Sequence, residues 1–106
     1  MQVNFDKAGC KPFFKKVRGR QRAIQEKIVT AVSEQVTTGM GKTKLAVNDR
    51  IEGQSIHEFR LNIGPMGSVR VAFFTDNRMA TVLFISTDLQ KSSFTGDLER
   101  FLKGRL

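Results

Sequence analysis

The chain has 106 residues, and its 18 lysines and arginines outweigh its 10 aspartates and glutamates, for a formal net charge of +8. A single cysteine and a single histidine exclude an internal disulfide and an ordinary Cys/His zinc site. The nine phenylalanines come with no tyrosine or tryptophan, which excludes any mechanism that needs a tyrosine hydroxyl. With no apolar run of roughly 20 residues and no signal peptide, we expect one cytoplasmic domain, residues 1–106, without cofactor, metal or membrane partner.

The first half of the chain predicts a short strand followed by two helices. Residues 2–5 alternate polar and apolar side chains, as a strand does. Pro12 suits the first turn of a helix, whose apolar side is then formed by Phe13, Phe14 and Val17. After an interruption at Gly19, apolar residues recur every three or four positions from about Gln21 to Val36. Two short consecutive helices predict a helical hairpin that lies on a flat surface.

The second half predicts three strands and a final helix. Residues 57–63 alternate with Glu58, Arg60 and Asn62 on the open face, and residues 69–74 follow after a Gly-Pro turn. Residues 80–85 are apolar on both faces, which is typical of a central strand covered on both sides. Apolar positions beyond Ser93 indicate the helix. The order β-α-α-β-β-β-α predicts an α+β fold, with the helical hairpin packed on a small, mostly antiparallel sheet.

The positive charge is concentrated in the first half of the chain. Residues 1–50 contain 11 basic and 4 acidic residues, and Glu26 is the only acidic residue between Lys11 and Lys27. This density favours a polyanionic partner, either a nucleic acid or an acidic protein, although a solvated helix face would look similar. The candidate nucleic-acid-binding residues are Lys15, Lys16, Arg18, Arg20, Arg22 and Lys44.

Arg60 and Arg70 stand near the middles of two adjacent predicted strands, and Lys91 follows the central strand. The turn between the strands fixes their approximate pairing, so the two arginines either share a face or sit diagonally. Cations fixed on a rigid sheet would suit a phosphodiester whose transition state gains negative charge. The alternative is structural: Arg60 would pair with Glu58 or Glu52, and Arg70 with Asp76.

Three side chains are candidates for proton transfer. His57 titrates near neutral pH, but its position in the strand pattern favours a structural role on the inward side. Glu58 and Asp88 are single carboxylates that could equally orient a basic side chain. Sequence spacing leaves the choice between the three open.

The order of these segments resembles the RelE/ParE superfamily of bacterial toxins. The resemblance rests on Lys44-Leu45, on the strand His57-Glu58-Phe59-Arg60-Leu61, on Gly67-Ser68-Val69-Arg70-Val71, and on Gln90-Lys91-Ser92 after an apolar strand. In the family these correspond to a K-L step, an aromatic-E-L-R strand, a G-x-Y-R-V strand and a basic segment. The lysine-serine ending is similar to the HigB-like branch. The match spans nearly the whole chain.

The resemblance implies a toxin of a type II toxin–antitoxin system that a cognate antitoxin neutralises. RelE- and HigB-like members cut mRNA on the ribosome without metal, whereas ParE-like members inhibit DNA gyrase. Carried over by motif, the catalytic cations would be Arg60, Arg70 and Lys91, with His57, Glu58 or Asp88 moving protons. This chain departs from the pattern at Val69, where the family has tyrosine, and it lacks the C-terminal tyrosine or histidine. A basic nucleic-acid-binding module without catalysis is the third alternative.

Overall fold

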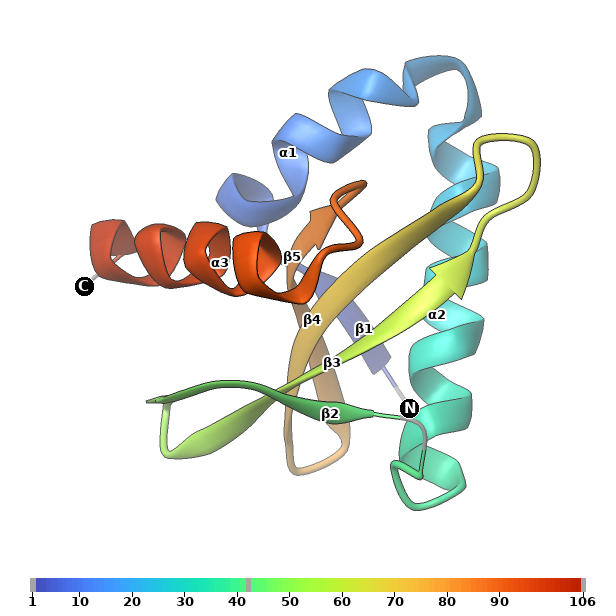
Figure 1. Ribbon diagram of the computed structural model, residues 1–106. Coiled ribbons are helices and arrows are strands. Elements are labelled where there is room, and N and C mark those ends of the chain that lie inside the picture. Colours follow the sequence, from blue (N-terminus) through green and yellow to red (C-terminus); the bar gives the residue numbers. More distant parts are fainter. Residues whose placement is uncertain (1, 42, 106) are drawn as a thin grey trace.

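The computed structural model describes residues 2–41 and 43–105, which form one five-stranded sheet with helices on both faces (Figure 1). The elements in chain order are β1 (Gln2–Phe5), α1 (Lys7–Lys16), the 3-10 helix η1 (Arg18–Arg20), α2 (Gln21–Thr37), β2 (Lys44–Ile51), β3 (Gln54–Asn62), β4 (Ser68–Asp76), β5 (Met79–Ser86) and α3 (Lys91–Arg105).

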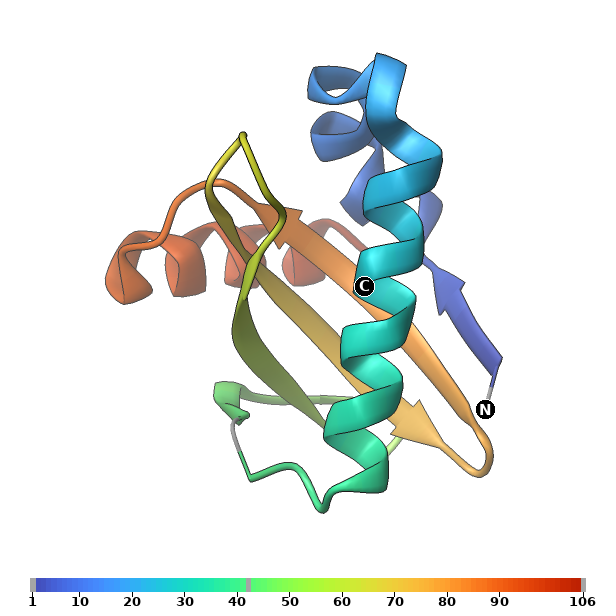
Figure 2. The ribbon, with the colours of Figure 1, turned by 90° about the vertical axis from the view of Figure 1, so that its right-hand side faces the viewer.

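The strands lie in the order β1-β5-β4-β3-β2, and only the β1–β5 pair is parallel. Figure 1 shows α1 and α2 diverging from η1, and Figure 2 shows α2 running across one face of the sheet with α3 behind the other. The α+β class and the mostly antiparallel sheet predicted from the sequence are confirmed. Among the described residues, no helix has the length and apolar character needed to cross a membrane.

Two apolar cores lie on opposite sides of this sheet. One joins α1 and α2 to strand residues such as Phe59, Val71 and Phe73, and the other joins α3 to Ile56, Ala72 and Leu83. Because strand side chains alternate between faces, neighbouring residues of one strand serve different cores. β5 lies between β1 and β4 and supplies both cores, which confirms the prediction of a strand covered on both sides.

The structure adds one strand that the predicted element order lacks. β2 spans Lys44–Ile51, and the predicted pattern becomes β-α-α-β-β-β-β-α. The register of β2 against β3 shifts between Leu45 and Arg50, and the consecutive residues Ala46 and Val47 are both buried. An irregular strand of this kind loses the strict alternation by which strands are recognised in a sequence.

Two helix boundaries differ from the prediction. Pro12 lies inside α1 instead of in its first turn, because the helix already begins at Lys7. The Asp6 side chain caps this start by accepting a hydrogen bond of 2.9 Å from the Gly9 amide. The last helix begins at Lys91, before Ser93, so the Lys91 side chain projects from the first residue of α3.

Candidate functional site

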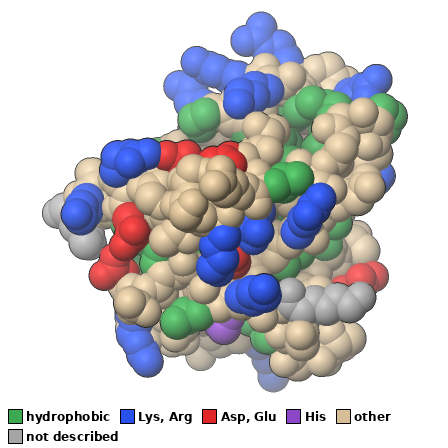
Figure 3. Space-filling model, in the orientation of Figure 1, with side chains coloured by type: hydrophobic (Ala, Val, Ile, Leu, Met, Phe, Trp, Pro, Cys, Tyr) green, Lys and Arg blue, Asp and Glu red, His purple; other side chains and the backbone are tan. Residues whose placement is uncertain are grey.

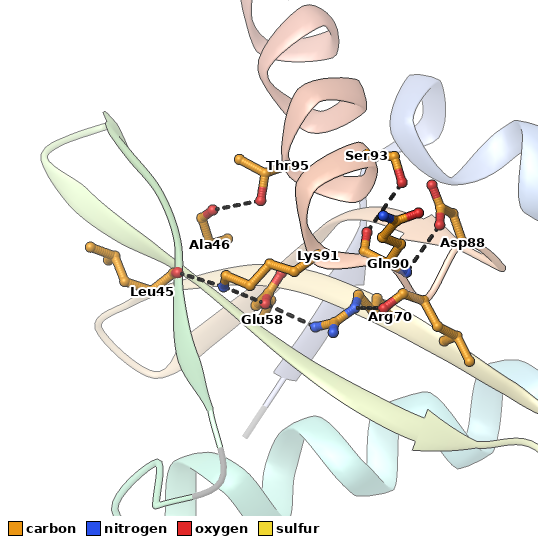
Figure 4. A network of polar contacts seen from close by, with 10 residues as sticks. Leu45, Ala46, Glu58, Arg70, Asp88, Gln90, Lys91, Ser93 and Thr95 are labelled. Atoms are coloured by element: carbon orange, nitrogen blue, oxygen red, sulfur yellow. Dashed lines mark hydrogen bonds and ion pairs between the residues drawn. The ribbon is translucent and has the colours of Figure 1, made fainter.

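A buried carboxylate holds two basic side chains on the face of the sheet that carries α3. Glu58 is only 1% exposed and is the only charged side chain that is buried among the described residues. Its Oε1 accepts a 3.0 Å hydrogen bond from Arg70 Nη1 and a 2.8 Å hydrogen bond from Lys91 Nζ (Figure 4). Its Oε2 is also buried and has no hydrogen-bond partner in the part of the chain that the structure describes. The Glu58 carboxylate is therefore the centre of the site.

The strand register places two more cations on the face of the sheet that carries this carboxylate. Arg60 lies directly opposite Arg70 across β3 and β4, and Lys44 lies directly opposite Glu58 across β2 and β3. Residues opposite each other in an antiparallel pair point to the same face, so of the two arrangements left open for Arg60 and Arg70, the shared face is confirmed. We call Lys44, Glu58, Arg60, Arg70 and Lys91 the Glu58 cluster. It has three positive charges in excess.

Hydrogen bonds to the backbone fix the two cations that bind Glu58. Arg70 Nε donates to the carbonyl oxygen of Leu89 at 2.8 Å, and Lys91 Nζ lies 3.5 Å from the carbonyl oxygen of Leu45 (Figure 4). The network thereby connects β2, β3, β4 and the segment that leads into α3. Arg70 does form an ion pair, as the structural alternative expected, but the predicted partner was wrong: it is Glu58 and not Asp76.

The three candidates for proton transfer lie in different places. His57 points to the opposite face from Glu58, where its ring centroid is 6.0 Å from that of Phe73. Asp88 lies in the loop before α3, where hydrogen bonds from Ser93 and from the Gln90 amide hold its pKa below the usual value. Of the three, Glu58 is the one that bonds both Arg70 and Lys91.

The surroundings of His57 predict a pH-dependent stability. Partial burial lowers the pKa of His57 below its ordinary value of 6.5. On acidification the unfolded chain therefore takes up this proton first, and folding stability is lost as the pH falls from about 6.5 through the folded pKa. The free energy of unfolding of the wild type should fall between about pH 7.5 and pH 5.5. Because phenylalanine has no titrating group, we expect this fall to be smaller in His57→Phe. Denaturant titrations at both pH values measure this, and an unchanged difference would contradict it.

Cys10 takes no part in the site. Its side chain is buried in the core, and desolvation together with the nearby charge of Asp6 raises the pKa of its thiol to about 12. A thiol with this pKa stays protonated near neutral pH and is a poor nucleophile.

The predicted nucleic-acid-binding residues divide into two groups. Lys15, Lys16, Arg18, Arg20 and Arg22 are exposed on α1, η1 and the start of α2, whereas Lys44 belongs to the Glu58 cluster. Figure 3 shows basic side chains gathered at the end of the molecule where α1 and η1 lie, and further basic side chains in the middle of the same face. Lys15 and Lys16 also stand in the last turn of α1, where the helix dipole stabilises positive charge.

Sequence reasoning missed two features of the site. Glu58 was expected on the open face of its strand but is buried, and the position of Lys44 depends on the unpredicted strand β2. No group of acidic, cysteine or histidine side chains able to hold a metal ion occurs within residues 2–41 and 43–105.

Comparisons with protein families, with curated proteins and with solved structures find no match to this chain. The chemistry of the Glu58 cluster is therefore the main basis for a functional proposal.

Proposed function

We propose that the protein is a metal-independent endoribonuclease that cuts mRNA, acting as the toxin of a toxin–antitoxin pair in the cytoplasm. The observation that carries the proposal is the Glu58 cluster, in which Arg70 and Lys91 bind one buried carboxylate and Lys44 and Arg60 lie on the same face of the sheet. The resemblance of the same segments to RelE-like toxins supports the choice of substrate. Ribosome-bound mRNA and an antitoxin protein are the partners that this resemblance implies.

The cluster has the groups that RNA transesterification requires. The substrate's own 2′-OH attacks the adjacent phosphorus, so the protein has to orient the phosphate and stabilise the charge of the phosphorane. Arg60 and Arg70 are opposite each other on rigid strands, and the exposed side of Lys91 adds a third cation. Two guanidiniums and an ammonium in this arrangement suit the non-bridging oxygens of a phosphodiester.

Proton transfer completes the proposed reaction. In the proposed reaction the bound phosphate draws the half-exposed Lys91 ammonium off Glu58 Oε1, and this oxygen then accepts the proton of the 2′-OH as the bond between O2′ and phosphorus forms. The bond between phosphorus and O5′ then breaks, and the leaving oxygen takes a proton from Lys91, whose Nζ is 2.8 Å from Glu58 Oε1. The products are a 2′,3′-cyclic phosphate and a 5′-hydroxyl, and the proton returns from Glu58 to Lys91 between turnovers.

The identity of the nucleophile is tested with a modified substrate. We expect the purified protein to cut an mRNA in a reconstituted translation reaction. A single 2′-deoxynucleotide on the 5′ side of the cut should abolish cleavage there, because this nucleotide lacks the 2′-OH that attacks the phosphorus. Sequencing of the product ends and chemical detection of the cyclic phosphate are the measurements. Cleavage of the deoxy substrate, or a product with a 5′-phosphate, would contradict the mechanism.

A second candidate is a binding module without catalysis. Neither a tyrosine nor a histidine joins the described part of the Glu58 cluster, and five exposed cations lie on α1, η1 and α2 away from it. Such a module would bind RNA with an affinity that falls steeply with salt and would leave the RNA intact.

The other alternative is a ParE-like gyrase inhibitor. Intact mRNA together with gyrase-dependent DNA damage would select it.

A further inference from the structure

An open groove lies away from the Glu58 cluster, between the end of β1, one side of α1 and the start of α2. Its volume is about 900 Å³. Its apolar floor includes Phe5 and Phe14, which are half-buried and pack edge to face with ring centroids 5.5 Å apart. Its rim is made of exposed cations, namely Lys7, Lys11, Lys15 and Arg18. The groove is thus apolar at the bottom and positively charged at the edge.

Three lysines of the rim lie close enough along α1 to repel one another. Lys7, Lys11 and Lys15 follow each other at intervals of four residues along one side of α1, where like charges destabilise a helix. The first turn of α1 contains no acidic residue. The one carboxylate of the groove, Asp6, caps α1 by accepting the hydrogen bond of the Gly9 amide. An acidic partner would relieve this repulsion.

We propose that this groove docks an acidic amphipathic segment of a partner protein. Apolar side chains of the segment would pack on Phe5 and Phe14, and its carboxylates would meet the lysines of the rim. A helix with acidic residues at intervals of four would repeat the spacing of the lysines on α1, which is about 6 Å per interval. The groove is separate from the Glu58 cluster, so docking there does not depend on the ribonuclease proposal.

Other occupants fit the groove less well. A second copy of the chain would bring a further net charge of +8 to a rim that is already positive. A small molecule would be enclosed on most of its surface in a typical binding site, whereas this groove is open to solvent. A nucleic-acid backbone would satisfy the lysines but would leave the apolar floor of Phe5 and Phe14 without a partner.

The test uses synthetic segments and two matched variants. The probe is a fluorescein-labelled peptide of about 15 residues, long enough to form a helix, with leucines along one face and glutamates flanking them. A second peptide has serine in place of the leucines, and a third probe is oligouridine RNA of similar length. Lys11→Glu/Lys15→Glu reverses two charges of the rim, and Lys103→Glu/Arg78→Glu reverses two exposed charges outside it.

We expect the leucine peptide to bind in fluorescence-anisotropy titrations and the serine peptide to bind at least about tenfold more weakly. The rim variant should lose at least about tenfold in affinity, whereas the control variant should stay within about threefold. No binding of the leucine peptide, equal losses in both variants, or tighter binding of oligouridine than of the peptide would each overturn the proposal. A dimer of the unliganded protein through this face, seen by sedimentation, would also overturn it.

Discussion

Replacing Glu58 with glutamine is expected to reduce the rate of RNA cleavage by about 100-fold or more, which is a common effect of losing a general base. The amide keeps an oxygen that can accept from Arg70 and Lys91 but cannot take a proton from the 2′-OH. Single-turnover cleavage of a ribosome-bound mRNA measures the chemical step. A rate within a few-fold of the wild type would remove Glu58 from the proposed mechanism and leave it with a structural role.

The ion pair between Glu58 and Arg70 is expected to contribute to the free energy of unfolding. Arg70→Met leaves Glu58 buried with only the half-exposed Lys91 as a partner, so we expect a loss of about 3 kcal/mol in the free energy of unfolding. Glu58→Gln should cost less free energy of unfolding in the Arg70→Met background than in the wild type, because the ion pair is already broken there. Urea denaturation of the wild type, both single variants and the double variant measures this coupling. Strictly additive losses would show that the pair contributes little.

Gly9→Ala is expected to be among the most destabilising single substitutions in the chain. A Cβ atom built on Gly9 would lie 1.7 Å from the backbone oxygen of Leu83 and 3.0 Å from the ring of Phe101. Backbone cannot rotate away as a side chain can, so α1 would have to move off β5 at a cost of about 3 kcal/mol or more. Thermal and urea denaturation measure the loss.

Gly19→Ala is the matched control for this substitution. A Cβ at Gly19, in η1, would have no atom within 4 Å, and its backbone has no positive φ that would oppose a side chain. We expect a change within about 1 kcal/mol, in the stabilising direction because the unfolded chain loses freedom. If Gly9→Ala were as mild as Gly19→Ala, the close contact between α1 and β5 would not exist as described.

The regular elements could be predicted because each has an apolar period that survives in the sequence. Ile24, Ile28 and Val32 mark one face of α2, and all three are buried. The period of residues 57–63 predicted the strand β3, but the face expected to be open is partly covered, because Glu58 is buried there. The turn between β3 and β4 sets Arg60 opposite Arg70. Local pattern therefore predicted the fold class, whereas turn length left two arrangements of the arginines open and only the strand register decided between them.

The composition of the site could be predicted only in part, because it depends on contacts between distant segments. Glu58 was one of three equivalent candidates, and its burial between Arg70 and Lys91 follows from the packing of α3 against the sheet. Lys44 was grouped with the candidate nucleic-acid-binding residues, since nothing in its own segment reveals the pairing of β2 with β3. Partners that lie 12 and 33 residues away from Glu58 leave no local signal.

The Glu58 cluster offers an acid–base pair in a chain that has no tyrosine. With Phe as its only aromatic residue type besides the single histidine, the chain has no phenol to move a proton. The structure places a carboxylate and an ammonium 2.8 Å apart, on the same face as two opposed arginines. We infer that this pair takes over the acid–base role that a tyrosine would have.

The most direct test of this account is a map of the 5′ ends of one mRNA in reconstituted translation with wild-type protein, Lys91→Ala and Lys103→Ala. Lys91 is 47% exposed and begins α3, so its removal leaves the two cores intact, and Lys103 lies exposed on the same helix away from the cluster. We expect discrete cuts with the wild type and with Lys103→Ala, and at least about a 100-fold loss of these cuts with Lys91→Ala. Intact mRNA with the wild type, or unchanged cuts with Lys91→Ala, would contradict the assignment of the Glu58 cluster as a ribonuclease site.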